Sequence, residues 1–276
     1  MKISVVTITY NAAKVLQRTL DSVSSQTYRN IEHLIIDGAS KDGTLDIVRS
    51  YELRVRSEES GVRSYEVRVV SEPDRGIYDA MNKGLCLATG DYIVFMNAGD
   101  TFHDKDTLES LTPDPSPKER GDSSLFTLHS SLPAVLYGDT DIVDSEGRFL
   151  RKRHLSVPEQ LTWRSFKQGM LVCHQAFYAR LDIARDIPYD LQYRHSADVD
   201  WCIRVMKEAE RRHLTLKRVP GVVADFMDGG NTTQNHRASL KERFQIMRKH
   251  YGLLTTLAMH VWFVIRSIPS LRASRQ

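Results

Sequence analysis

The sequence predicts an α/β protein whose sheet is doubly wound and whose functional site lies at the carboxyl ends of the strands. Two observations lead to this prediction. Short runs with the pattern of strands, beginning with the β-branched Ile3–Thr9 and then Ile31–Asp37, alternate with segments that carry apolar residues at helical spacing. This alternation is typical of a largely parallel sheet with helices on both faces. Polar residues also follow directly after the strands, where such sheets bind their ligands.

Each element follows from its local pattern. Ile3–Thr9 is β-branched and is expected to be a buried strand, and the apolar residues between 12 and 25 recur as on one face of a helix. The turn at Asp42 and Gly43 opens a second helix. The remaining elements repeat this order: strand Ile31–Asp37, helix Thr44–Tyr51, strand Val67–Ser71, helix Ile77–Ala88, strands Tyr92–Met96 and Ala134–Tyr137, and a helix that begins within 193–201.

The composition is that of a globular protein and excludes several classes of function. The chain has 276 residues, 41% of them hydrophobic and 26% charged, so one principal domain with a sizeable core is expected. A net charge of +3, from 38 basic and 35 acidic residues, does not indicate a nucleic-acid-binding protein. Three cysteines without a C-x-x-C pair indicate neither a disulfide framework nor a zinc site, and they fit a reducing compartment.

We expect a domain over residues 1–230 and a basic, amphipathic helical tail over 231–276. Two segments, 52–66 and 112–133, interrupt the order of strands and helices and are predicted to be surface insertions. The N-terminus lacks the pattern of a signal peptide, and the apolar segment 253–265 is too short to span a bilayer, so a cytoplasmic protein is expected. The tail is expected either to lie on the inner face of the cytoplasmic membrane or to pack on protein.

Several short motifs follow one another along residues 1–230. They are Val5–Asn11, Ile35–Thr44, Ser71–Gly84, Asn97–Asp100, Cys173–Gln175 and Ala197–Trp201. Together they resemble glycosyltransferase family 2, and their order is more specific than any one of them. The resemblance implies a single nucleotide-diphospho-sugar transferase domain, Rossmann-like and of the GT-A type, and an inverting reaction. A Q-x-x-R-W motif does not occur, which favours a non-processive enzyme.

The resemblance also implies that a nucleotide-sugar donor binds at the strand ends. Tyr10 can offer a ring face to the base, and Thr9 and Asn11 beside it can make polar contacts. Ordinary packing at a strand end is the alternative role for Tyr10. The other residues expected on the donor side carry polar or charged side chains after later strands: Asp37, Arg75, Asp79, Asn82 and Asn97. Arg75 is expected to pair with a phosphate or with Asp37.

A divalent cation, Mg²⁺ or Mn²⁺, is the cofactor that the resemblance implies. The family's D-x-D metal motif corresponds here to Asn97–Asp100, where asparagine replaces the first acid and Gly99 stands at the usual ligand position. We expect Asp100 to be the metal ligand, because the glycine beside it lets the backbone adjust. Carboxylate oxygens are ligands that both cations prefer.

Asp198 is expected to be the catalytic base. It stands where the family's E-D motif has its aspartate, with Ala197 in place of the glutamate. Such an aspartate takes the proton of the acceptor hydroxyl as that hydroxyl attacks the anomeric carbon. Capping of the helix N-terminus is its alternative role. His174 and Gln175 are expected on the acceptor or phosphate side of the site.

The sequence leaves two other functions open. A nucleotidyltransferase would use a similar sheet and a metal, although no glycine-rich loop follows the first strand. A non-catalytic sugar-nucleotide-binding or assembly protein would explain the altered motif at 97–100. We favour transfer of a single sugar to a saccharide or lipid-linked acceptor in cell-surface polysaccharide biosynthesis, without a nucleic-acid partner.

Overall fold

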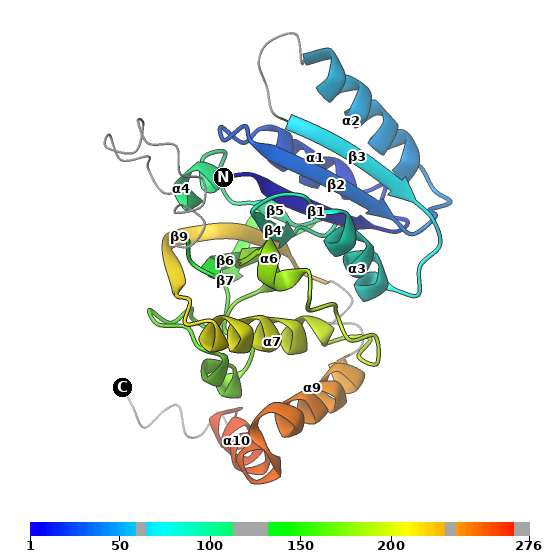
Figure 1. Ribbon diagram of the computed structural model, residues 1–276. Coiled ribbons are helices and arrows are strands. Elements are labelled where there is room, and N and C mark those ends of the chain that lie inside the picture. The colour runs from blue at the N-terminus through cyan, green and yellow to red at the C-terminus, as the bar shows by residue number, and fades with distance from the viewer. Residues whose placement is uncertain (59–64, 113–131, 230–235, 268–276) are drawn as a thin grey trace, which may run out of the picture.

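The N-terminal half of the sheet is parallel and follows the predicted alternation. The computed structural model describes residues 1–58, 65–112, 132–229 and 236–267. Four parallel strands lie side by side in the order β3 (Tyr65–Ser71), β2 (Ile31–Asp37), β1 (Ile3–Thr9) and β4 (Tyr92–Phe95). Helices α1 (Leu16–Ser24), α2 (Thr44–Glu58) and α3 (Ile77–Leu87) connect them (Figure 1). The register pairs Thr9 with Asp37 and Asp37 with Ser71, so the carboxyl ends of these strands share one edge.

The second half of the sheet is mixed. Strand β8 (Phe177–Arg180) runs antiparallel to both β4 and β6 (Val135–Val143), and β9 (Leu216–Met227) runs parallel to β6. Two short strands complete the sheet, β5 (Thr101–Phe102) on β9 and β7 (Phe149–Lys152) on β6. The predicted α/β class is therefore confirmed, but the doubly wound parallel pattern holds only for the first four strands.

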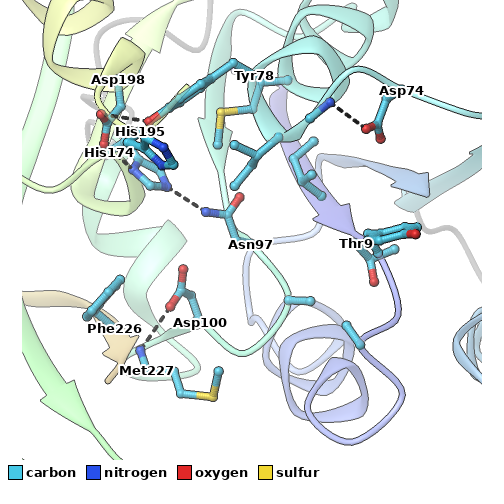
Figure 2. Close-up of a pocket in the computed structure, with 17 residues that line it drawn as sticks. Thr9, Asp74, Tyr78, Asn97, Asp100, His174, His195, Asp198, Phe226 and Met227 are labelled. Carbon is cyan, nitrogen blue, oxygen red and sulfur yellow. Dashed lines mark hydrogen bonds and ion pairs between the residues drawn. The ribbon is translucent and has the colours of Figure 1, made fainter. Parts of the chain in front are cut away.

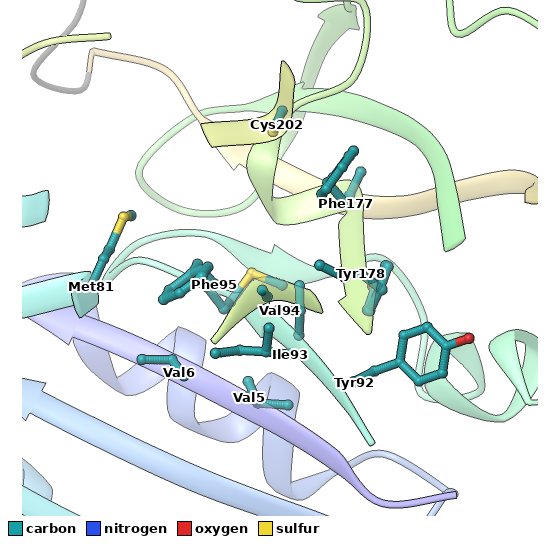
Figure 3. Packing of buried hydrophobic residues seen from close by; sticks show 14 of the residues in the cluster. Val5, Val6, Met81, Tyr92, Ile93, Val94, Phe95, Phe177, Tyr178 and Cys202 are labelled. Atoms are coloured by element: carbon teal, nitrogen blue, oxygen red, sulfur yellow. The ribbon is translucent and has the colours of Figure 1, made fainter. Parts of the chain in front are cut away.

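The core lies along β1 and β4, which are buried on both faces. Every residue of β1 and of β4 is buried, as expected for central strands that helices or loops cover on both sides (Figure 3). Helix α3 approaches β1 closely at Gly84, where a Cβ atom would lie 2.3 Å from Cγ1 of Val6. Glycine at this position thus brings the helix, and the residues at its N-terminus, close to the sheet edge.

The structure corrects the expected end of the second helix. We predicted a helix over Thr44–Tyr51 followed by an insertion over 52–66, but α2 continues to Glu58 and β3 begins at Tyr65. Tyr51 and Val55 are buried against the core, so the apolar face of the helix extends through the first half of the predicted insertion. The remainder, 59–64, and most of the second predicted insertion, 113–131, lie outside the described residues.

Helices of the C-terminal half cover the other end of the molecule. Helix α7 (Ala197–Arg211) packs against α9 (His236–Tyr251), which is followed by α10 (Leu253–Ser267) (Figure 1). The short helical segments are α4 (Thr107–Leu111), η2 (Trp163–Gln168), η3 (His174–Ala176) and α6 (Leu181–Ala184). None of the helices in the described ranges is long and apolar enough to cross a membrane.

A buried ion cluster joins α7 to α9. The carboxylate of Asp200 is fully buried and pairs with Arg204 on α7 and with Lys249 and His250 on α9, at 2.6, 3.1 and 2.8 Å. Burial alone would raise the pKa of Asp200, but these partners outweigh it and hold the pKa well below its usual value. The first helix of the predicted tail is therefore part of the packed structure, because a charge buried on α7 depends on α9 for two of its three partners.

A second buried polar cluster lies beneath α2. His33 on β2 is fully buried, and its ring nitrogens lie 2.9 Å from the Thr7 hydroxyl and 2.9 Å from the Tyr51 hydroxyl, with the Tyr65 hydroxyl at 3.2 Å. Burial lowers the pKa of His33 to about 3. The folded protein thus holds this ring neutral at pH values at which the unfolded chain would protonate it.

We expect His33 to make the fold sensitive to acid. Between about pH 6.5 and 3 the unfolded chain binds a proton here that the folded chain does not, so stability falls as pH falls, by on the order of 2 kcal/mol between pH 7 and pH 5. Urea unfolding at both pH values measures the loss. His33→Gln cannot titrate and should show a flatter pH dependence; equal slopes in both proteins would contradict this role.

Candidate active site

A pocket of about 430 Å³ opens where the carboxyl ends of β1 and β4 meet the N-termini of α3 and α7. Loops after β4, the segment at η3 and the end of β9 complete its wall. Figure 2 shows that the labelled polar residues of the pocket converge from these separate elements. Parallel strands bring their carboxyl ends to one edge, and this explains why residues far apart in the sequence meet here.

Asp198 lies at the start of α7 and faces the pocket. The Tyr78 hydroxyl, on the first turn of α3, donates a hydrogen bond of 3.1 Å to Oδ1 of Asp198. Nδ1 of His174 lies 3.2 Å from Oδ2 of the same carboxylate. The side chain of Asp198 is 16% exposed, so it is accessible from the pocket although these two partners fix its orientation.

Asn97 continues this chain of hydrogen bonds. Its Nδ2 lies 2.9 Å from Nε2 of His174, which therefore accepts, and Nδ1–H of His174 then donates to Asp198. Oδ1 of Asn97 is buried and has no hydrogen-bond partner in the described part of the chain. The loop after β4 and the start of α7 are thereby coupled through a single imidazole.

Opposing influences set the pKa of Asp198. Burial alone would raise it, but the hydrogen bond from His174, the positive charge of Arg243 and the hydrogen bond from Tyr78 outweigh burial. The pKa of this carboxyl consequently lies below its usual value. Asp198 is ionised at neutral pH and can accept a proton, and the predicted position of the base thus coincides with a carboxylate in a pocket.

Helix α9 positions the segment that precedes Asp198. The carboxylate of Glu242 accepts hydrogen bonds from the backbone N–H groups of Arg194 and His195, at 2.9 and 2.8 Å. The hydroxyls of Ser196 and Ser239 lie 3.0 Å apart and are both buried. Residues of the predicted tail therefore fix the backbone from which Asp198 projects.

Asp100 lines the same pocket from the loop after β4, but other groups occupy its oxygens. Nε2 of Gln175 donates to Oδ2 over 2.6 Å, and the backbone N–H of Met227 donates to Oδ1 over 3.0 Å. Asp100 is 4% exposed, and this burial raises the pKa of its carboxyl to about 6. Gln175, expected to contact the acceptor or a phosphate, instead holds Asp100.

The structure gives a physical reason for glycine at the usual ligand position. Gly99 has φ +103°, and a Cβ atom there would lie 2.5 Å from Cε of Met227. A residue with a side chain would be strained by this backbone conformation, and the end of the Met227 side chain would have to move. An acidic ligand therefore does not fit at position 99, and Asp100 is the carboxylate that this loop presents.

The donor set suits a hard cation that is shared with a phosphate. Asp100 offers a carboxylate and Asn97 a buried amide oxygen without a partner in the described ranges, and both residues line the pocket. Oxygen donors of this kind are what Mg²⁺ and Mn²⁺ bind, commonly together with substrate phosphates. Among the described residues no group of three or more His, Cys, Asp or Glu side chains could hold a metal ion without such help.

The end of β1 forms the other side of the pocket. Tyr10 is 62% exposed and lines it together with Asp74, and Oγ1 of Thr9 is buried without a partner in the described structure. Gly38 makes this arrangement possible, because a Cβ atom there would lie 2.5 Å from Oδ2 of Asp74 and 3.2 Å from the ring of Tyr10. An aromatic face, a hydroxyl and a carboxylate thus stand together at one strand end.

Several predicted donor residues do not line the pocket. Asp37 is fully buried, and its carboxylate accepts hydrogen bonds from the hydroxyls of Ser40 and Ser71 at 2.5 and 2.7 Å. Asn82 exchanges two hydrogen bonds with the backbone of Tyr189, at 2.7 and 3.0 Å. Both residues therefore have structural partners of their own.

The pair Arg75 and Asp79 also lies outside the pocket lining. Nη2 of Arg75 is 2.8 Å from Oδ1 of Asp79, so Arg75 pairs with Asp79 and not with Asp37, which was one of its two expected partners. The side chain of Arg75 is 77% exposed. Asn11 likewise uses its side chain locally, accepting a hydrogen bond of 2.9 Å from the backbone N–H of Lys41.

The pocket is lined in part by three residues that the sequence pattern did not single out, Tyr78, Asp74 and His195. Tyr78 contacts the carboxylate of Asp198, Asp74 stands beside Tyr10, and His195 lines the pocket with a buried Nδ1 that has no partner in the described chain. Tyr78 and Asp74 lie within the motif Ser71–Gly84, and His195 stands just before Ala197–Trp201. The available signal was thus their proximity to predicted residues, since Tyr78 precedes Asp79 and His195 stands three positions before Asp198.

The sequence matches a known family and a curated relative. Residues 4–113 match the family model described as Glycosyl transferase family 2. A PGL/p-HBAD biosynthesis glycosyltransferase of Mycobacterium bovis is 32% identical over 228 residues, which are 82% of this chain and 77% of the relative.

Solved structures share the fold at low sequence identity. Staphylococcus aureus TarS in complex with UDP-GlcNAc superposes with a TM-score of 0.63 at 19% identity, covering 90% of this chain and 65% of the TarS chain. The mannosyltransferase PcManGT of Pyrobaculum calidifontis, in complex with GDP-Man and Mn²⁺, gives a TM-score of 0.57 at 18% identity, covering 99% of this chain and 79% of the other.

Proposed function

This chain belongs to glycosyl transferase family 2, and from that premise we propose that it transfers one sugar from a nucleoside diphosphate sugar to an acceptor hydroxyl with inversion. The observation that carries this proposal is the ionised carboxylate of Asp198, which faces the pocket and is held by Tyr78 and His174. A one-step displacement needs a base on the acceptor side, and this is the role we assign to Asp198.

In the proposed reaction the acceptor oxygen forms a bond to the anomeric carbon while the bond from that carbon to the diphosphate oxygen breaks. The hydroxyl proton passes to Asp198, and the bonding electrons leave with the diphosphate. His174 keeps the carboxylate oriented through Nδ1, which Asn97 fixes as the donor nitrogen. Tyr10 offers its exposed ring to the base, and Asp74 accepts from base or ribose donors beside it.

Asp100 and Asn97 would hold a divalent cation together with the diphosphate oxygens of the donor. When bound, Mg²⁺ or Mn²⁺ would neutralise the charge that develops on the leaving diphosphate. PcManGT, which shares the fold, was solved in complex with both GDP-Man and Mn²⁺, and this supports the same cofactor class here. A nucleoside diphosphate sugar is the donor class that we propose.

The proposed transfer and its two alternatives differ in the products that they form. A panel of nucleotide sugars incubated with the protein and Mn²⁺ should release nucleoside diphosphate from one donor, and NMR of the product should show an inverted anomeric configuration. A nucleotidyltransferase would instead leave sugar 1-phosphate from such a donor, and it would release pyrophosphate only when given a nucleoside triphosphate and a sugar 1-phosphate. A non-catalytic protein would bind a donor without turnover. Retention of the anomeric configuration, or no release of nucleoside diphosphate from any donor, would contradict the proposed reaction.

We expect Asp100→Asn to weaken donor binding only when metal is present. The amide keeps the shape of the carboxylate but loses its charge, so the dissociation constant of the donor with Mn²⁺ should rise about tenfold or more, roughly 1.4 kcal/mol. Calorimetry with and without EDTA measures the effect. Asp79→Asn is the matched control, since Asp79 pairs with Arg75 away from the pocket. An equal loss in EDTA would show that Asp100 does not act through a metal.

We place the reaction in cell-surface glycolipid or polysaccharide biosynthesis, at the inner face of the cytoplasmic membrane. The Mycobacterium bovis relative is a glycosyltransferase of PGL/p-HBAD biosynthesis, which supports an acceptor of glycolipid type over a free sugar. A saccharide or a lipid-linked sugar would present the accepting hydroxyl to Asp198. Acceptor class and location are both tested by the experiments on the C-terminal helices described below.

A further inference from the structure

A second pocket, of about 580 Å³, lies between the C-terminal helices and the segment 154–170. Its wall is largely apolar: Leu155, Phe166, Met170, Leu240, Met247 and Phe263. Aliphatic, thioether and aromatic side chains form most of this wall, and such a lining favours an alkyl or aryl group over a bare sugar ring. Its polar members are His154, Gln168, Arg243, His260 and Arg266.

This apolar pocket reaches the neighbourhood of the catalytic carboxylate. Val199, which lines it, directly follows Asp198, and Arg243 lines it from α9. Arg243 directly follows Glu242, which holds the backbone segment before Asp198, and its charge also helps to lower the pKa of Asp198. Nε of Arg243 is buried and has no hydrogen-bond partner in the ranges that the structure describes. Arg243 thus lines the apolar pocket from the same helix that positions the segment before Asp198.

We propose that this pocket binds the apolar part of the acceptor, an alkyl or aryl group attached close to the hydroxyl that receives the sugar. This inference rests on the proposed function and names the acceptor class of the same site. The apolar group would fill the space between α9, α10 and residues 154–170, while the polar end of the acceptor would pass Arg243 and reach Asp198. Arg243 would then donate to an oxygen at the junction of the two parts.

Alkyl glucosides of increasing chain length, used below the concentration at which they form micelles, test the pocket without a need to know the natural acceptor. Calorimetry should show that octyl glucoside binds at least about tenfold more tightly than methyl glucoside, because each buried methylene adds favourable transfer free energy. Leu240→Trp, which fills the mouth of the pocket from α9, should bring the affinity for octyl glucoside down to that for methyl glucoside.

Leu254→Trp on α10 is the matched control, because Leu254 is 84% exposed and is not among the residues that line the pocket. It should leave the preference for the octyl chain unchanged. Equal binding of the methyl and octyl compounds by the unmodified protein overturns the inference, and so does a preference that Leu240→Trp leaves intact. Release of nucleoside diphosphate from the donor panel is measured separately, so a failure of the pocket is distinguished from a failure of the transferase.

Discussion

Asp198→Asn should remove most of the turnover while leaving the protein folded and the donor bound. The variant keeps the size of the side chain and can still accept a hydrogen bond from Tyr78 or His174, but it cannot take the acceptor proton. Loss of a general base typically costs 10²- to 10⁴-fold, and we expect kcat to fall by about that much. Initial rates of diphosphate release, with donor affinity from calorimetry, measure the change.

Tyr78→Phe is a milder variant that tests the same carboxylate. It removes only the hydroxyl that donates to Oδ1 of Asp198 and leaves the carboxylate in place. A loss of roughly tenfold is expected, corresponding to one hydrogen bond of about 1.4 kcal/mol. If Asp198→Asn retained near-normal transfer, the base would have to be another group, and Asp198 would keep only its place at the start of α7.

The sequence predicted that Asp198 lies in the candidate site because two independent signals coincide at this residue. It lies within a motif of the family, and it begins a helix with a clear apolar face, which fixes where the residue enters the fold. The buried strands β1 and β2 were predicted with their observed bounds for a similar reason. The β-branched run of β1 and the apolar residues Leu34, Ile35 and Ile36 of β2, each followed by a polar residue, are typical of buried parallel strands.

The donor side was harder to predict because neighbouring residues of a helix point in different directions. Asp79 is predicted on the donor side, but it pairs with Arg75, and its neighbour Tyr78 contacts Asp198 instead. One position along a helix rotates a side chain by about 100°. Asp37 lies outside the pocket lining, and the reason is non-local. Its carboxylate accepts hydrogen bonds from Ser40 and Ser71. The bond from Ser71 depends on the register of β2 with β3, which the sequence does not reveal.

The C-terminal helices α9 and α10 have different surroundings, which the sequence pattern could not show. The pattern predicts one tail that either packs on protein or lies on a membrane. Helix α9 takes the first of these alternatives: it is tied to the segment before Asp198 through Glu242 and to α7 through Lys249 and His250. Both helices have apolar and basic residues, so amphipathic pattern alone does not show which apolar face is already covered.

Helix α10 keeps a broad apolar face in contact with solvent. Its exposed large hydrophobic residues are Leu253, Leu254, Leu257, Val261, Trp262, Val264 and Ile265. Arg266 lies near its end, 5.1 Å above the ring of Trp262. An exposed apolar patch with an aromatic anchor and basic neighbours is typical of a helix that lies in the plane of a membrane surface. We therefore propose that α10 attaches the enzyme to the membrane that carries its acceptor.

The protein should sediment with liposomes of anionic lipid, and the double variant Leu254→Asp with Val261→Asp should reduce the bound fraction at least about tenfold, because both charges would enter the apolar part of the interface. High salt should weaken only the contribution of the basic residues, about 1 kcal/mol for each one near the surface. Leu53→Asp is the matched control, since Leu53 is 69% exposed on α2, far from α10 in the fold. If the unmodified protein stays in the supernatant at low salt while light scattering shows a dimer that the double variant lacks, α10 binds a second subunit and the membrane proposal is wrong.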